Sequence, residues 1–142
     1  MQTETTQADC HHMADWLLTK GWDYFFTATF RTPENRADRA VARVSRVLEA
    51  LPPARVFLAS EPFEKGDYHV HGLYHYSRYW AATLPSYRLS GATIFEALYQ
   101  GLGRARVEEV NSPLAVTNYC AKYVSKRMSD YGFAGWLRDW QE

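Results

Sequence analysis

The chain has little cysteine, no long apolar run and no excess of charge of either sign. Its two cysteines, Cys10 and Cys120, fit no paired framework, so each is expected to be a free thiol in a reducing cytosol. No stretch approaches the roughly twenty apolar residues of a membrane-spanning helix, and the polar start lacks the pattern of a secretion signal. These absences predict a cytoplasmic protein that has no membrane partner.

The formal net charge is zero, whereas a protein that holds DNA by its phosphates usually carries an excess of basic residues. The positive charges are nevertheless concentrated in two stretches, and local potential matters more than the total. The first stretch is equally well interpreted as the solvated face of a helix. The two stretches contain Arg31, Arg36, Arg39, Arg43 and Arg46, and Lys122, Lys126 and Arg127.

Composition and periodicity predict one α+β domain over residues 1–142. The chain is 46% hydrophobic and 15% aromatic, which is enough for a real core. Helical spacing is found over 8–20, 36–51, 92–100 and 112–127, and strand patterns over 22–31, 55–61, 68–76 and 103–110. The tail, 131–142, is expected to form a short helix. This order predicts an antiparallel sheet of four to five strands with helices packed on it, close to a ferredoxin-like or RRM-like core.

A candidate metal site lies in the segment Tyr-His-Val-His-Gly at 68–72. In a strand, His69 and His71 project from the same face. If a simple turn centred near Lys65 precedes them, Glu61 lies directly across from His69, about 5 Å away. Two imidazoles and a carboxylate suit Mn²⁺ or Mg²⁺, with positions left for a phosphate oxygen and water. Glu64 is the alternative third ligand, although it falls in the turn, and an isolated His-x-His is more often simply two strand residues.

A doubled Tyr-x-x-Lys motif follows about fifty residues later. On a helix, Tyr119 and Tyr123 share one face. Lys122 and Lys126 each follow a tyrosine by three positions, where an ammonium can steady a phosphate or lower the pKa of the phenol. The alternative is that both rings simply pack on the sheet. Two phenols, each with its own lysine, favour a catalytic interpretation.

These motifs resemble those of a known family. His69-Val70-His71 resembles the His-hydrophobic-His signature of the HUH endonucleases, and the doubled Tyr-x-x-Lys resembles the tyrosine motif of their rolling-circle replication initiators. The two-tyrosine form looks most like the initiators of small single-stranded DNA phages and plasmids. The segment Phe26 to Phe30 is similar to a degenerate first motif of that family, so three motifs occur in the expected order over 22–127.

The resemblance implies a site-specific single-stranded DNA endonuclease and strand transferase that initiates rolling-circle replication. A Mn²⁺ or Mg²⁺ ion held by Glu61, His69 and His71 would assist attack by Tyr119 or Tyr123, leaving a 5′-phosphotyrosyl link and a free 3′-hydroxyl. The chain has no Walker-type phosphate loop, so a host helicase and polymerase are expected partners at the replication origin. Single-stranded DNA would lie along the sheet, with its bases and phosphates near Tyr74, Tyr76, Arg31, Arg36, Arg39 and Arg43.

Three other functions fit parts of the sequence. A single-tyrosine transposase of the same superfamily has a similar length, but the doubled motif points away from it. A non-catalytic nucleic-acid-binding module on an RRM-like sheet would use the aromatic residues without a metal. A metal enzyme acting on small molecules is supported by His-x-His alone.

Overall fold

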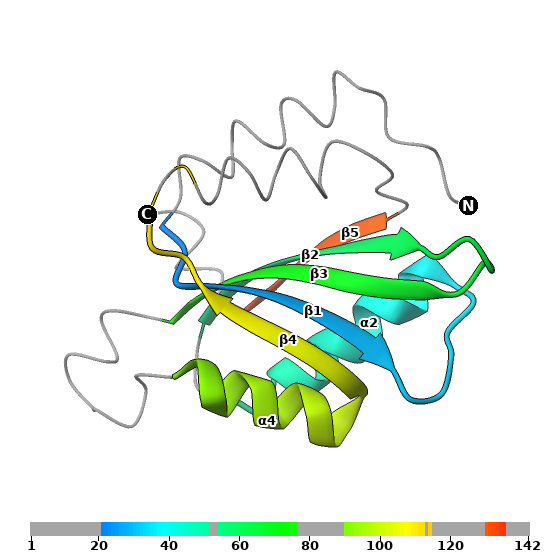
Figure 1. Ribbon diagram of the computed structural model, residues 1–142, viewed down its shortest axis with the longest axis horizontal. Coiled ribbons are helices and arrows are strands. Elements are labelled where there is room, and N and C mark those ends of the chain that lie inside the picture. Colours follow the sequence, from blue (N-terminus) through cyan, green and yellow to red (C-terminus); the bar gives the residue numbers. More distant parts are fainter. Residues whose placement is uncertain (1–20, 52–53, 77–89, 113, 115–129, 136–142) are drawn as a thin grey trace.

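The computed structural model describes residues 21–51, 54–76, 90–112, 114 and 130–135 (Figure 1). The helix expected over 8–20 and most of the one expected over 112–127 lie outside these ranges. Within them the structure contains two helices and five strands. These are β1 (Tyr24–Phe30), α2 (Ala37–Leu48), β2 (Ala54–Pro62), β3 (Tyr68–Tyr76), α4 (Gly91–Gly101), β4 (Gly103–Glu109) and β5 (Asp130–Gly135).

The five strands form one antiparallel sheet in the order β4-β1-β3-β2-β5. The succession β1-α2-β2-β3-α4-β4, with β3 between β1 and β2, is the split βαβ arrangement of a ferredoxin-like core. The predicted α+β fold with an antiparallel sheet is therefore confirmed. The helix predicted over 131–142 is wrong for 131–135, because these residues form a strand whose backbone hydrogen bonds are made with β2. Residues 136–142 lie outside the described ranges.

Both helices cover the same face of the sheet (Figure 1). In α2, the apolar residues at every fourth position, Ala40, Val44 and Leu48, are buried. Ile94 and Leu98 of α4 join them, and the Oγ of Ser90 caps this helix by accepting a hydrogen bond from the Thr93 amide. These side chains pack on the sheet residues Phe26, Ala28, Val56, Leu58, Val70 and Tyr74.

Gly72 is required by packing in the middle of β3. It pairs with Phe26 of β1, and a Cβ atom at Gly72 would lie 2.1 Å from the Phe26 ring. The ring occupies the space that a side chain would need. The glycine that ends the Tyr-His-Val-His-Gly segment thus lets the core close over the strand that carries both histidines.

The opposite face of the sheet carries the histidines, because alternate residues of a strand project to opposite sides. Phe57 and Leu73 on this face are also fully buried. No helix in the part of the chain described here is long and apolar enough to cross a membrane.

Candidate metal centre

The β2–β3 hairpin brings the three predicted metal ligands together. Its loop is closed by a hydrogen bond from the Phe63 amide to the Asp67 carbonyl, at 2.7 Å. Gly66, with φ of +96°, adopts a conformation that favours glycine and donates to the Phe63 carbonyl. In the resulting register, Glu61 lies directly opposite His69. The pairing predicted from the turn is confirmed.

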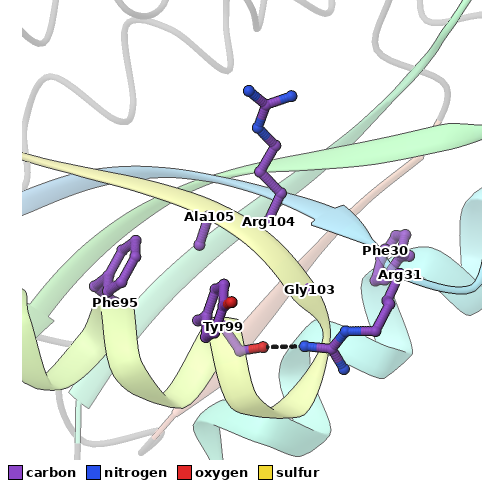
Figure 2. Close-up of a pocket in the computed structure, with 7 residues that line it drawn as sticks. All are labelled: Phe30, Arg31, Phe95, Tyr99, Gly103, Arg104 and Ala105. Carbon is purple, nitrogen blue, oxygen red and sulfur yellow. Dashed lines mark hydrogen bonds between the residues drawn. The ribbon is translucent and has the colours of Figure 1, made fainter.

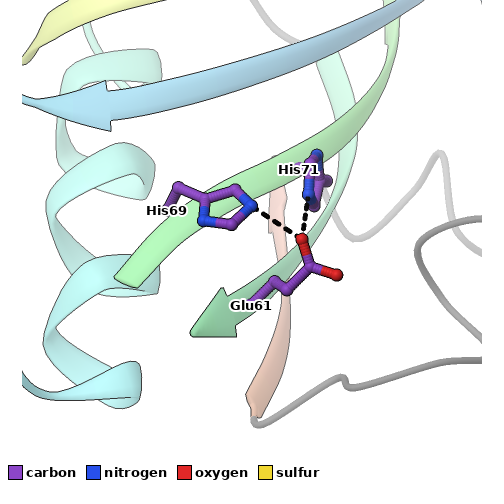
Figure 3. Close-up of side chains that lie close together, drawn as sticks. All are labelled: Glu61, His69 and His71. Carbon is purple, nitrogen blue, oxygen red and sulfur yellow. Dashed lines mark hydrogen bonds and ion pairs between the residues drawn. The ribbon is translucent and has the colours of Figure 1, made fainter. Parts of the chain in front are cut away.

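The side chains of Glu61, His69 and His71 converge on one point (Figure 3). The Oε1 atom of Glu61 lies 2.7 Å from Nε2 of His69 and 3.1 Å from Nε2 of His71. The two imidazole rings meet edge to face, with centroids 4.7 Å apart. Both histidines are buried and Glu61 is partly exposed. The cluster therefore has one side open to solvent at the carboxylate.

This geometry fits a divalent ion. One ligand atom from each residue lies within 4.8 Å of the others. Nitrogen and oxygen ligands about 2.0–2.2 Å from a metal are separated from one another by about 3–4 Å, so small side-chain shifts would let these atoms surround an ion. Three protein ligands leave further coordination positions for water or substrate, which is typical of a catalytic site. Glu64 is exposed in the turn and does not belong to this group of ligands.

The electrostatics of Glu61 match a ligand that stays ionised. Burial alone would raise the pKa of its carboxyl group, but the hydrogen bonds from His69 and His71 outweigh burial and lower that pKa to about 2. A carboxylate that is ionised at all physiological pH values needs no deprotonation before it binds a cation.

Thr27 of β1 orients His71 from the other side of its ring. The Oγ1 atom of Thr27 lies 3.0 Å from Nδ1 of His71, and the two residues are paired across β1 and β3. When a metal replaces the Nε2–H contact with Glu61, an Nδ1–H that donates to Thr27 would leave the lone pair of Nε2 to bind the metal. Thr27 lies in the segment from Phe26 to Phe30. This segment therefore contacts the segment that carries His69 and His71.

An exposed aromatic ring borders the cluster. Phe63 is 42% exposed, and its ring centroid lies 4.2 Å from that of His69. The Nδ1 atom of His69 is buried and has no hydrogen-bond partner among the residues described. The His69 ring is therefore held by packing against Phe63 and by Glu61, rather than by a second polar contact.

Two arginines lie on the same face as the cluster. Arg104 pairs with Thr29, which pairs with His69, and Arg106 pairs with Thr27, which pairs with His71. Two strand spacings separate the arginines from the histidines, about 10 Å at the backbone. Both side chains are exposed, and Arg106 forms an ion pair with Glu108 at 2.6 Å.

No sequence pattern singles out Arg104 and Arg106, because their position depends on β4 pairing with β1 rather than with its neighbour in sequence. The alternation of β4 predicts only that both project from one face of that strand.

The arginines predicted to contact DNA lie elsewhere. Arg36, Arg39 and Arg43 precede or lie on α2, which covers the face opposite the cluster. Arg36 forms two hydrogen bonds with Asp38, and Arg43 donates to the Thr32 carbonyl and lies over the Phe30 ring. Because α2 packs on the other face of the sheet, these three arginines lie away from Glu61, His69 and His71, and their contact with DNA stays a prediction. Arg31 follows the last residue of β1, beside the last turn of α4.

Tyr74 and Tyr76, predicted to stack bases, are buried in the core beneath the helices. Tyr74 is 0% exposed, and burial, together with the charge of Asp23, raises the pKa of its phenol. A ring that has no exposed surface cannot stack on a nucleotide, so this prediction is wrong for Tyr74. Tyr76 is 9% exposed, and its contact with DNA stays a prediction. Alternation along β3 directs even-numbered residues to the helix side and the histidines to the other.

The residues of the doubled tyrosine motif, Tyr119, Lys122, Tyr123 and Lys126, lie outside the described residues.

His75 belongs to a separate polar contact on the histidine face. Its Nδ1 atom lies 3.1 Å from Oδ2 of Asp23, which also accepts a hydrogen bond from the Tyr76 amide. Arg55, paired with His75, donates to the Gly21 carbonyl. His75 is thus held by structural contacts and is not one of the metal-ligand group.

Comparisons of the chain with known protein families, with curated proteins and with solved structures find no match.

Proposed function

We propose that this protein is a metal-dependent tyrosine transesterase of the HUH type that nicks and rejoins single-stranded DNA. The observation that carries this proposal is the convergence of Glu61, His69 and His71 on the face of a ferredoxin-like sheet opposite its helices. An isolated His-x-His is weak support for metal binding. A carboxylate fixed across the hairpin from one histidine, with Thr27 behind the other, is much more specific.

The three side chains would hold Mn²⁺ or Mg²⁺. An ion bound there supplies Lewis-acid polarisation of a phosphate oxygen. Glu61 contributes a permanent negative charge, and the two imidazoles contribute neutral nitrogen ligands. Thr27 holds the His71 ring so that its Nε2 atom stays directed at the site. Arg104 and Arg106, on the same face, are suited to hold the phosphates of the strand on either side of the scissile bond.

Tyr119 and Tyr123 are the proposed nucleophiles. The phenol oxygen of one tyrosine forms a bond to phosphorus while the bond from phosphorus to the 3′-oxygen breaks. The phenol loses its proton and the departing 3′-oxygen gains one, so the products are a 5′-phosphotyrosyl link and a free 3′-hydroxyl. A 3′-hydroxyl can later reverse the step, because the covalent link conserves the phosphodiester energy. Lys122 and Lys126 would stabilise the phenolate or the phosphate.

The biological role proposed for this reaction is the initiation of rolling-circle replication at an origin in a phage or plasmid. The free 3′-hydroxyl serves as the primer for a host polymerase, and a host helicase separates the strands. Both partners follow from the chemistry of the products and from the lack of a Walker-type loop in this chain.

The test is covalent capture of DNA. The full chain is incubated with Mn²⁺ and a pool of random single-stranded oligonucleotides, and protein bearing DNA is separated on a denaturing gel. We expect an adduct in the wild type that is absent in the Tyr119→Phe, Tyr123→Phe double variant, in His71→Ala and in EDTA. Sequencing the captured DNA then identifies the target.

Two results would contradict the proposal. If DNA is retained under native conditions but no adduct survives denaturation, the protein is a binding module rather than a transesterase. If the adduct persists in the double tyrosine variant, another nucleophile is responsible. Glu64→Gln, which alters an exposed residue of the same hairpin turn but removes no ligand or nucleophile, should still form the adduct.

A further inference from the structure

A second concave site lies at the edge of the sheet, away from the metal centre. A pocket of about 350 Å³ is formed between α4, the end of β1 and the start of β4 (Figure 2). Its lining includes Phe95, Tyr99, Arg31 and Arg104. No acidic residue belongs to the lining. The pocket therefore combines aromatic surface with positive charge only.

Two exposed aromatic rings form one wall. Phe95 is 39% exposed and Tyr99 is 48% exposed, although both are large apolar side chains. They lie one helical turn apart on α4, with ring centroids 5.8 Å apart and planes inclined by 14°. The two partly exposed rings thus lie next to each other with nearly parallel planes (Figure 2). A planar ligand can stack against such a surface.

Arg31 is fixed beside these rings. Its Nη2 atom donates a 2.6 Å hydrogen bond to the Tyr99 carbonyl in the last turn of α4, and its guanidinium lies 6.0 Å from the centroid of the Tyr99 ring. The hydrogen bond uses one of the five N–H donors of the guanidinium, and the others remain available for an anion. Because the arginine is already ordered, little conformational entropy is lost when it binds.

Arg104 connects the pocket to the metal face. It lines the pocket, but its side chain extends away from Phe95 and Tyr99 (Figure 2). Along the ladder it pairs with Thr29, which pairs with His69, which pairs with Glu61. A polyanion that starts at the pocket and passes Arg104 would therefore reach the metal centre along a single row of the sheet.

We infer that this pocket binds a base of single-stranded DNA a few nucleotides from the scissile phosphate, with the base stacked on Phe95 and Tyr99 and its phosphates held by Arg31 and Arg104. Flat aromatic faces and arginines without competing acids complement a base and its phosphate. The choice of DNA as the ligand rests on the proposed function, whereas the affinity for a planar anion rests on the pocket alone.

The test measures binding without chemistry. Fluorescence anisotropy of a fluorescein-labelled oligodeoxythymidine is followed in EDTA, with the full chain. We expect Phe95→Ala and Tyr99→Ala to weaken binding by about 5- to 150-fold each, the range for loss of one stacked base. Tyr99→Trp should retain affinity because it keeps a stacking surface. An abasic oligonucleotide should bind the wild type and Tyr99→Ala about equally.

Charge and stacking are separated by the salt dependence. Arg104→Ala should reduce the slope of log affinity against log salt by about 0.7, the value for one phosphate contact on a single strand. Two variants are the matched controls. Gln100→Ala lies on the same helix but outside the lining, and Arg36→Ala alters a guanidinium that already binds Asp38. Both should leave the affinity and its salt dependence unchanged. Circular dichroism and thermal melting check that each variant is folded.

The outcomes distinguish this inference from the proposed function. If the adduct forms with Mn²⁺ but Phe95→Ala and Tyr99→Ala bind oligodeoxythymidine as the wild type does, the pocket inference is overturned and the transesterase stands. If no adduct forms but binding depends on these rings, the pocket binds DNA in a non-catalytic protein. If the wild type shows no affinity for the oligonucleotide, the inference is wrong.

Discussion

Thr27 and His71 face each other across β1 and β3, with Oγ1 of Thr27 3.0 Å from Nδ1 of His71. The opposite nitrogen of the same ring, Nε2, lies 3.1 Å from Glu61. One imidazole is thus held between a hydroxyl group on one strand and a carboxylate on another. This relationship joins the two weakest motifs of the sequence into one site.

Removing the Thr27 hydroxyl should weaken metal binding without removing a ligand. Thr27→Val keeps the shape of the side chain but leaves Nδ1 of His71 without this partner, and outer-shell changes of this kind typically cost about 10- to 100-fold in metal affinity. The measurement is isothermal titration with Mn²⁺. Thr29→Val, two residues along the same strand and face, is the control and should bind as the wild type does. Equal affinity in both variants would show that Thr27 does not orient the ring.

Glu61→Gln should destabilise the metal-free protein at neutral pH. The folded-state pKa of Glu61, about 2, is lower than its ordinary value of 4.5, so its stabilisation is complete above pH 4.5 and is lost as the pH falls toward 2. We expect a loss of about 1–2 kcal/mol near pH 7, after allowance for solvent screening of a partly exposed carboxylate. The difference in the free energy of unfolding between this variant and the wild type is measured by urea unfolding in EDTA at several pH values.

The difference between Glu61→Gln and the wild type should shrink as the pH is lowered through that window. Glu64→Gln, in the exposed turn of the same hairpin, should have the same free energy of unfolding as the wild type at every pH. A Glu61→Gln deficit that stayed constant down to the lowest pH would rule out the ionised carboxylate as its cause.

Gly72→Ala should be destabilising although alanine is a small residue. Its Cβ atom would overlap the Phe26 ring, and overpacking of a closed core costs about 1–3 kcal/mol. Gly21→Ala is the matched control, because the nearest atoms would lie 3.9 Å from its Cβ, at ordinary van der Waals contact. Chemical denaturation of both variants gives the comparison, and similar stabilities would mean that the Phe26 ring can move aside without cost.

Tyr74→Phe should leave stability unchanged or raise it by up to about 1 kcal/mol. The Tyr74 hydroxyl is buried and has no hydrogen-bond partner among the residues described, so its removal relieves the cost of burying an unpaired polar group. The same denaturation measurement applies. A clear loss of stability would indicate a partner for this hydroxyl and contradict the assignment of Tyr74 as a purely apolar core residue.

Local patterns in the sequence were sufficient to predict the β2–β3 hairpin and the convergence of Glu61, His69 and His71. Alternation in β3 places His69 and His71 on one face, and the short turn fixes Glu61 opposite His69, so both depend on neighbouring residues alone. The helices α2 and α4 follow from apolar spacing and from the proline and glycine residues that flank them.

Features that depend on strand order could not be predicted in the same way. The position of Arg104 opposite Thr29 requires β4 to pair with β1, and the position of the α2 arginines requires that helix to cover the far face. The segment at 130–135 contains two glycines and reads poorly as a strand, yet it pairs with β2 at the edge of the sheet. Contacts between segments that are far apart in the sequence determined all three positions.

The most direct test of the central claim is a Mn²⁺ titration of the full chain followed by electron paramagnetic resonance, in which the signal of free Mn²⁺ falls as the ion is bound. We predict a single saturable site in the wild type that is lost in His71→Ala and in Glu61→Ala, while Glu64→Ala keeps it. Unchanged Mn²⁺ binding in both ligand variants would contradict the assignment of Glu61, His69 and His71 as the metal centre and remove the main support for the proposed transesterase.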